Sequence, residues 1–169
     1  MEQLAGSDPP GADRPSDTPA GGPRRRIYDE PVNRFVAGFI GRPPMNFLDA
    51  GVARDGAVVE GRGFAFAAGS RVAAALKGRY SKIGAGVRPE HLRPVEGEPS
   101  RPSAIDGRIE LIEPLGSQVM IQVATAAGLV TAQFERRAGL TVGQPVRLGQ
   151  VPDMLHVFDA LSGRSVLAV

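Results

Sequence analysis

The spacing of apolar residues changes near Met45 and divides the chain into a short helical segment and a long β-rich one. Between residues 32 and 40 apolar side chains recur at three- and four-residue steps. This period predicts a helix with one apolar face, made of Val32, Phe35, Val36, Phe39 and Ile40. Gly41 suits the left-handed cap that commonly follows a helix.

A shorter helix is expected just before this one. Pro23 is tolerated in a first helical turn, so residues 24–30 can form a helix that Pro31 stops. Residues 1–21 consist mainly of Pro, Gly, Asp, Ser and Ala and contain too few large apolar side chains to offset the entropy of ordering. We therefore predict a disordered tail over 1–21, short helices over 22–44 and a β-barrel domain over 45–169.

From Met45 onward the apolar residues alternate with polar or small ones, which is the pattern of half-buried strands. Asp55-Gly56 is a strong hairpin signal between a strand near residues 48–52 and a single returning strand over 57–66. A short helix or turn is expected over 71–77. Further strands are expected over 83–87, 105–111, 119–123 and 130–134, with another beginning near Val146. Many short strands with closely spaced turns favour a small Greek-key barrel of the oligonucleotide/oligosaccharide-binding (OB) type.

Composition narrows the class of protein. The 169 residues contain 42% hydrophobic but only 5% aromatic residues, which suits one domain with a modest core of Val, Ile, Leu and Ala. There are no cysteines, so disulfides, thiolate metal sites and thiol nucleophiles are excluded. No apolar run is long enough to span a membrane, and the N-terminus lacks the apolar core of a signal peptide. We expect a cytoplasmic protein.

The stretch from Ile27 to Leu48 resembles a junction found in the ATP-binding subunits of bacterial ABC importers for sugars and glycerol phosphate, of the maltose-transporter type. There the nucleotide-binding domain ends and a C-terminal regulatory TOBE domain, an OB-type (MOP-like) β-barrel, begins. The matching residues are Gly22, Pro23, Ile27, Tyr28, Pro31, Asn33, Phe35, Val36, Ala37, Phe39, Ile40, Gly41, Met45, Asn46 and Phe47.

Three later motifs resemble the same regulatory domain. They are the run Gly86-Val87-Arg88-Pro89-Glu90-His91, the turn Glu113-Pro114-Leu115-Gly116, and Leu155-His156-Val157-Phe158-Asp159 followed by Gly163. The resemblance covers about residues 22–169 and none of the catalytic domain, whose place before Gly22 is taken by the low-complexity segment.

The resemblance implies a regulatory and assembly module without an ATPase site of its own. Its expected partners are a second copy or an intact ABC ATPase subunit, a regulatory protein, and indirectly a membrane permease, which would place the chain peripherally at the inner face of the membrane. No cofactor is expected in this chain, because ATP and Mg belong to the missing domain. The interface residues that the resemblance implies are Arg34, Phe47, Gly86, Arg88, Glu90 and Gly116.

Each of these positions also has a purely structural interpretation. Arg34 can be a solvated helix face and Phe47 a core residue, while Gly86 and Gly116 can simply serve turns. Arg88 and Glu90 fit an internal Arg–carboxylate clamp, which we favour over a role in partner binding.

Enzymatic chemistry is not expected from this sequence. A Gly-rich phosphate loop ending in Lys-Ser/Thr, which nucleotide hydrolysis needs, is absent. His91 and His156 are isolated from other ligand residues in sequence, so we expect neither to bind a metal. Residues 161–165, Leu-Ser-Gly-Arg-Ser, superficially resemble the ABC signature, but their position near the end of the chain favours a β-turn.

Three other interpretations remain open. An OB-type barrel can bind nucleic acid, although this chain has no run of alternating aromatic and basic residues. It can bind a small oxyanion, for which Ser103 or Ser117 could supply hydroxyls. It can also be a truncated gene product without an independent role.

Overall fold

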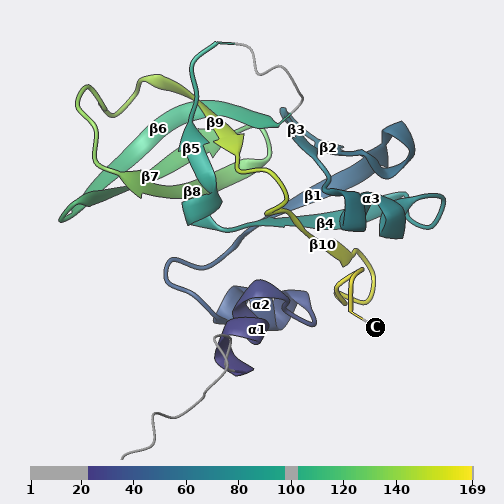
Figure 1. The fold of residues 1–169 in the computed structure, drawn as a ribbon. Helices are drawn as coiled ribbons and strands as arrows, with labels where there is room; N and C mark the ends of the chain where they lie inside the picture. The colour runs from purple at the N-terminus through teal and green to yellow at the C-terminus, as the bar shows by residue number, and fades with distance from the viewer. Residues whose placement is uncertain (1–22, 98–102, 169) are drawn as a thin grey trace, which may run out of the picture.

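The computed structural model describes residues 23–97 and 103–168, so the predicted tail over 1–21 lies outside the described residues. A curled antiparallel sheet forms the body, and a pair of short helices lies below its middle in the view of Figure 1. This arrangement confirms the predicted mainly-β, OB-type fold class with short N-terminal helices.

The helical pair consists of α1 (Pro23–Asp29) and α2 (Arg34–Phe39). The predicted second helix began two residues too early, because Asn33 caps it: the Asn33 side chain accepts a hydrogen bond from the Val36 N–H at 2.8 Å. Gly41 has a φ of +114°, which confirms the predicted left-handed cap.

The sheet contains ten strands within the described residues. In spatial order its main path is β10-β4-β1-β2-β3-β6-β7-β8, and β5 and β9 pair with each other beside β6. The bounds are β1 (Asn46–Ala53), β2 (Val58–Gly61), β3 (Phe64–Ala67), β4 (Lys82–Val87), β5 (Leu92–Pro94), β6 (Ala104–Leu115), β7 (Gln118–Thr125), β8 (Gly128–Glu135), β9 (Pro145–Gln150) and β10 (His156–Asp159). A helix α3 (Ser70–Leu76) and two 3₁₀ turns, η1 (Arg54–Gly56) and η2 (Pro89–His91), complete the elements.

The predicted single strand over 57–66 is wrong, because it is a hairpin of β2 and β3. Gly61 pairs with Phe64, so only Arg62 and Gly63 form the loop. Gly63 has a φ of +72°, a conformation that glycine adopts without steric cost, and this allows the two-residue reversal.

The alternating apolar positions form the main core, as the period of two predicts. Val119, Ile121 and Val123 of β7 are buried and pack with Val130 and Ala132 of β8. A second, smaller cluster of Ala37, Met45 and Phe158, with Phe47 packed against it, joins α2 to the barrel.

Asn46 closes the barrel at the seam between β1 and β8. Its side-chain oxygen accepts a hydrogen bond from the Thr131 N–H at 2.8 Å, and its Nδ2 donates to the Thr131 carbonyl at 2.8 Å and to the Val87 carbonyl at 3.1 Å. A side-chain amide has the same donor and acceptor as a peptide group, so it substitutes for a strand partner at the free edge of β8.

Candidate functional site

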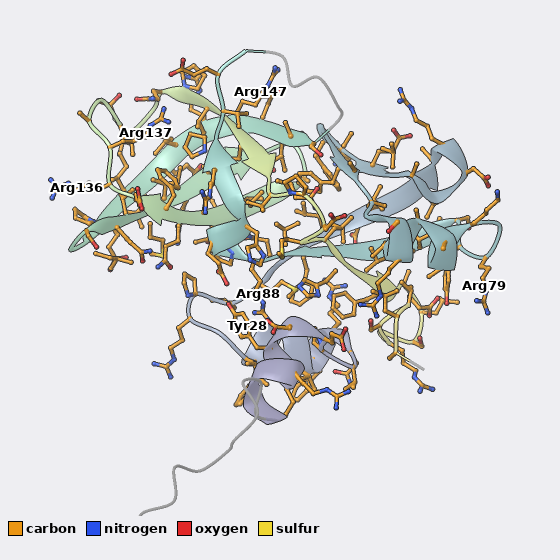
Figure 2. The ribbon with its side chains drawn as sticks, in the orientation of Figure 1. Tyr28, Arg79, Arg88, Arg136, Arg137 and Arg147 are labelled. Atoms are coloured by element: carbon orange, nitrogen blue, oxygen red, sulfur yellow. The ribbon has the colours of Figure 1, made fainter. Side chains whose placement is uncertain are left out.

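The helical pair is fastened to the barrel by Arg88, which follows β4 and is 1% exposed. Its Nη1 donates to the carbonyl of Ile40 at 3.0 Å, and its Nη2 donates to the carbonyl of Tyr28 at 2.5 Å. The guanidinium carbon lies 3.5 Å from the centroid of the Tyr28 ring. Figure 2 shows both side chains between the helices and the sheet.

Local sequence explains why the two acceptors meet at this point. Tyr28 is in the last turn of α1, and Ile40 directly follows α2. Carbonyls at helix ends lack an intrahelical partner and carry partial negative charge, so they suit a cation. A Cβ on Gly41 would lie 3.1 Å from Nη1 of Arg88, so the glycine leaves room for the guanidinium.

The predicted Arg–carboxylate clamp needs correction. Arg88 is indeed an internal clamp, but among the described residues no ion pair joins it to Glu90, and the groups that it contacts are two carbonyls and a ring. The Tyr28 hydroxyl, not Arg88, donates a hydrogen bond to the Glu90 carboxylate. Burial raises the pKa of Tyr28 to about 12, and the hydrogen bond to Glu90 acts in the same direction. The hydroxyl therefore stays protonated and keeps donating.

Arg34 and Phe47 form the accessible part of the junction. The exposed Arg34 guanidinium lies 4.9 Å from the centroid of the Phe47 ring. That ring meets Phe158 edge-on at 5.8 Å, which anchors it to β10. The half-buried Phe47 is thus a platform whose ring face attracts an exposed cation.

Gly86 pairs with Phe47 in the sheet and is buried. A Cβ at this position would lie 2.6 Å from the Met45 sulfur and 2.9 Å from the Phe158 ring, closer than real contacts allow. Gly86 is therefore needed for close packing under the platform, and its backbone is not at the surface.

Gly116 lies elsewhere. It occupies the β6–β7 turn with a φ of +65° and is exposed, and a Cβ added there would have no heavy atom within 4 Å. The structure brings together Arg34, Phe47, Gly86, Arg88 and Glu90, but it does not bring Gly116 to them.

Both histidines lie at the junction, although no sequence pattern indicated that they would meet. Burial lowers the pKa of His156 to about 4, and the positive charges of Arg88 and protonated His91 add to this effect. Burial also lowers the pKa of His91, whose Nδ1 has no partner within the described residues. Near neutral pH we therefore expect both rings to be uncharged.

Three residues of the junction were not proposed as site residues from sequence. Tyr28 belongs to the Ile-Tyr pair of the junction motif, which was the available signal. Asn46 belongs to the Met-Asn-Phe motif, and a polar residue at the start of an apolar strand was its signal. His156 belongs to the Leu-His-Val-Phe-Asp motif, which was its signal, but only the fold places it beside Arg88.

A cleft of about 660 Å³ opens between the helical pair and the barrel. Its apolar wall includes Ile27, Val32 and Val157, and its rim holds charges of both signs. Arg71 at the rim lies 3.2 Å from Glu30, so these two charges are already paired.

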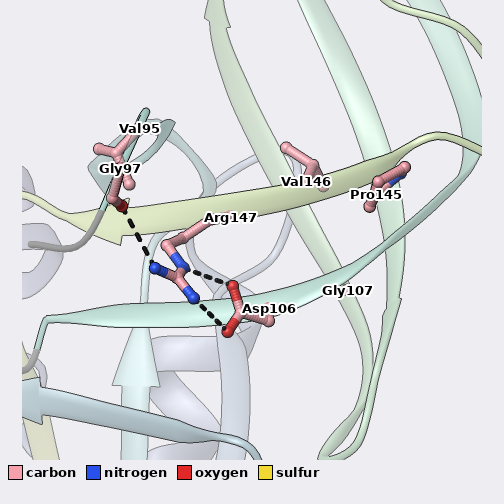
Figure 3. A pocket seen from close by; sticks show the side chains of 7 residues that line it. All are labelled: Val95, Gly97, Asp106, Gly107, Pro145, Val146 and Arg147. Atoms are coloured by element: carbon pink, nitrogen blue, oxygen red, sulfur yellow. Dashed lines mark hydrogen bonds and ion pairs between the residues drawn. The ribbon is translucent and has the colours of Figure 1, made fainter.

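A second cavity, of about 460 Å³, is lined by residues of the paired strands β6 and β9 and by Val95 and Gly97, which follow β5 (Figure 3). Arg147 holds Asp106 through two contacts, Nε–Oδ1 at 2.6 Å and Nη2–Oδ2 at 3.0 Å, and this lowers the pKa of the Asp106 carboxyl. Nη1 of Arg147 also donates to the Gly97 carbonyl at 3.2 Å. The Arg147 guanidinium that lines this cavity is therefore already bound by Asp106 and Gly97.

The hydroxyls considered for an oxyanion site are far apart. Ser103 precedes the twelve-residue strand β6, and its Oγ accepts a hydrogen bond from the Ala67 N–H at 3.2 Å. Ser117 follows the same strand in an exposed turn. The two lie at opposite ends of β6 and do not form one site.

Within the described part of the chain, the aromatic side chains do not form a platform for stacking bases. Of the seven phenylalanines, Phe64, Phe66, Phe134 and Phe158 are buried and Phe47 is half-buried. The exposed Phe35 and Phe39 stack on each other on α2, which is not part of the barrel. The geometry therefore does not favour nucleic-acid binding.

No group of three or more His, Asp or Glu residues suited to a metal ion occurs within residues 23–97 and 103–168. In the same ranges, no helix has the length and apolar character needed to cross a bilayer.

Two family models match the chain in succession. The MalK OB fold domain matches residues 41–92, and the TOBE domain matches residues 85–158. Residues 41–158 belong to the family of MalK-type OB-fold and TOBE domains. The site described above lies where this family's domain meets the helices that precede it.

Several curated relatives of this TOBE-domain chain are named as ATP-binding proteins of transporters. A sulfoquinovosyl glycerol transport ATP-binding protein of Agrobacterium fabrum is 34% identical over 143 residues, which are 83% of this chain and 38% of the relative. An sn-glycerol-3-phosphate import ATP-binding protein of Ruegeria pomeroyi is 34% identical over 83% of this chain and 37% of its own length. A lactose transport ATP-binding protein of Rhizobium radiobacter is 34% identical over 83% of this chain and 39% of its own length. The chain thus spans less than two fifths of these relatives, in their C-terminal region.

The fold also resembles a solved structure. The cytoplasmic molybdate-binding protein ModG superposes with a TM-score of 0.54 at 19% identity, covering 66% of this chain and 94% of that one. At this identity the likeness shows a shared fold alone.

Proposed function

We propose that this chain is a regulatory and assembly module of an ATP-binding subunit of an ABC importer for carbohydrates or glycerol phosphate. It associates with an intact subunit or with a second copy of itself, and it has no ATPase site of its own. The observation that supports this proposal is the consecutive match of residues 41–158 to domains that the curated relatives carry beside their ATP-binding portion.

The accessible residues of the junction suit a protein contact. Arg34 is exposed and stacked on Phe47, so its guanidinium is held in place before a partner arrives. Arginine on a fixed aromatic platform loses little side-chain entropy on binding, and such residues are enriched at interface hot spots. Arg88 and Glu90 contribute differently, because they hold the helices that present Arg34.

The proposal places the chain at the inner face of the membrane, where an importer subunit would hold it against the permeases. A further expected partner is a regulatory protein that binds the same surface around Arg34 and Phe47. ATP and Mg would bind only to the partner subunit.

An ATPase assay tests the proposal. The chain alone, given Mg-ATP, should release phosphate no faster than a blank. Added to the intact sn-glycerol-3-phosphate import ATP-binding protein of Ruegeria pomeroyi, it should lower the ATPase rate saturably, because it competes with the subunit's own C-terminal domain. Arg34→Ser should weaken this inhibition, whereas Arg79→Ser, at an exposed arginine at the far end of the sheet (Figure 2), should not. An unchanged rate at saturating chain would contradict the proposal.

A further inference from the structure

Helix α2 carries an apolar ridge that nothing in the described structure covers. The side chains of Phe35 and Phe39 are 79% and 82% exposed, and their rings stack with centroids 6.2 Å apart. Of the predicted apolar face, only Val36 and Ile40 are partly buried, and the buried residue of the helix is Ala37. The two largest side chains of the predicted apolar face therefore point away from the barrel core.

The ridge continues into the cleft beneath it. Val32 is 57% exposed beside the ridge and also lines the cleft of about 660 Å³, together with Ile27 and Val36. A contiguous exposed apolar surface on a soluble domain usually marks a contact with another protein. The two phenylalanines supply the large aromatic anchors that such contacts use.

The comparisons indicate which part of the relatives this helix belongs to. The MalK OB fold model begins at residue 41, so α1 and α2 lie outside both matched domains. The relatives match 83% of the 169 residues, which leaves 17%, about 29 residues, unmatched. Even a match reaching Val169 must therefore begin by about residue 30 and include α2. The relatives therefore share this helix. In their sequences it precedes the OB-fold domain and so lies next to their ATP-binding portion.

We propose that the Phe35–Phe39 ridge docks on the ATP-binding domain of an importer subunit, where it takes the place of that subunit's own counterpart of α2. This inference rests on the proposed function and names its contact surface. The chain would then bind in trans, as a complementing fragment, most strongly to a domain whose own helix is missing or displaced. Arg88 sets the position of the ridge, because it fixes the backbone directly after α2 to the barrel.

A titration with two forms of one partner tests this proposal. The partner is the Ruegeria pomeroyi subunit, either intact or truncated just before the region that matches this chain, with nucleotide binding used to verify that the truncated form is folded. The full chain should bind the truncated form at least about tenfold more tightly than the intact form, because the docking site is then open. A tenfold change corresponds to about 1.4 kcal/mol.

Substitutions within the chain locate the contact. Phe35→Ser and Phe39→Ser should each weaken binding to the truncated form about tenfold or more, and Leu129→Ser should not. Leu129 is a matched control, because it is 56% exposed but lies at the start of β8. If the truncated subunit does not fold, a chimera provides the same comparison.

In this chimera residues 23–168 replace the subunit's own C-terminal region. Phe35→Ser should then lower the melting temperature of the chimera's ATP-binding domain, and Leu129→Ser should not.

The outcomes separate this inference from the proposed function. Binding to the intact subunit that is as tight as to the truncated form, and unaffected by Phe35→Ser, would overturn the docking proposal while leaving the regulatory role in place. The docking proposal would also be overturned if the chain alone forms a dimer that Phe35→Ser dissociates. The ridge would then be covered by a second copy of the chain. Binding to neither form would contradict both proposals.

Discussion

The guanidinium of Arg88 lies over the ring of Tyr28, 3.5 Å from its centroid, although the two residues are 60 positions apart in sequence. This pair joins the two parts of the molecule. The buried cation bridges the ends of two short helices, and the ring under it is oriented by its hydrogen bond to Glu90. The contact ties both helices to the end of β4, beside the smaller apolar cluster that also joins α2 to the barrel.

Removing Arg88 should release the helices without unfolding the barrel. Arg88→Met leaves the carbonyls of Tyr28 and Ile40 without a buried donor, which should lower the free energy of unfolding by about 1–3 kcal/mol. Amide hydrogen exchange should increase over α2 and change little in β7. Arg88→Lys should give an intermediate effect, because an ammonium cannot donate in a fork or stack as a guanidinium does.

Arg108 offers a matched control for this experiment. It also donates to a backbone carbonyl, that of Gly143, but it is exposed. Arg108→Met should therefore leave exchange over α2 unchanged. Equal exchange in the two variants would show that Arg88 does not hold the helices.

Asn46 should be essential for barrel closure. Asn46→Ala removes three hydrogen bonds to Val87 and Thr131 and should destabilise the fold by about 1–3 kcal/mol. Asn46→Asp should also destabilise it, since a carboxylate cannot donate to either carbonyl. Urea denaturation measures both. Gln133→Ala removes an exposed side-chain bond on the same strand β8 and should change stability by less than about 0.5 kcal/mol.

A methyl group at Gly86 should disturb the platform under Arg34. Gly86→Ala places a Cβ against Met45 and Phe158 and should cost about 1–3 kcal/mol. Gly84 is on the same strand, and the nearest atom to a Cβ added there would be 3.9 Å away, so Gly84→Ala should be tolerated. Thermal melts of the two variants provide the comparison, and equal melting temperatures would contradict the packing role of Gly86.

Acid should loosen the junction through His156. The pKa of this residue is about 4 in the folded chain and near 6.5 when unfolded, so the unfolded state binds more protons between these values. The stability that the neutral ring contributes is fully present above pH 6.5, falls as the pH drops toward 4, and amounts to at most about 3 kcal/mol. His91 acts in the same direction, because its folded pKa is also lowered.

Denaturation curves between pH 7.5 and 4.5 measure this dependence. In His156→Asn the loss of stability over that range should be smaller than in the unaltered chain, although stability at pH 7.5 can itself be lower. An identical slope in the two proteins would show that His156 does not titrate with unfolding.

The strand pattern of the sequence was sufficient to predict the fold class. Alternation at Val119, Ile121 and Val123 correctly identified an inward-facing row, because the period of two follows from backbone geometry alone. Gly41 was assigned to a left-handed cap from its position after a helix. The β2–β3 hairpin was missed because Arg62-Gly63 is a weaker turn signal than Asp55-Gly56.

The candidate site was only partly predictable. Gly86, Arg88 and Glu90 were selected through a motif, but the true partners of Arg88 are carbonyls about 50 to 60 residues earlier, and carbonyls have no sequence signature. The exposure of Phe35 and Phe39 also could not be predicted from the sequence. An apolar face at helical spacing predicts burial, but it does not say whether the covering surface belongs to this chain or to another.

Sedimentation velocity of the fluorescently labelled chain mixed with an intact ATP-binding subunit tests the central claim most directly. If the chain is a regulatory and assembly module, the label should move into a faster-sedimenting species that saturates at micromolar subunit. Arg34→Ser should reduce that species, and Arg79→Ser should not. A label that sediments as the free chain at every micromolar concentration of subunit would contradict the account.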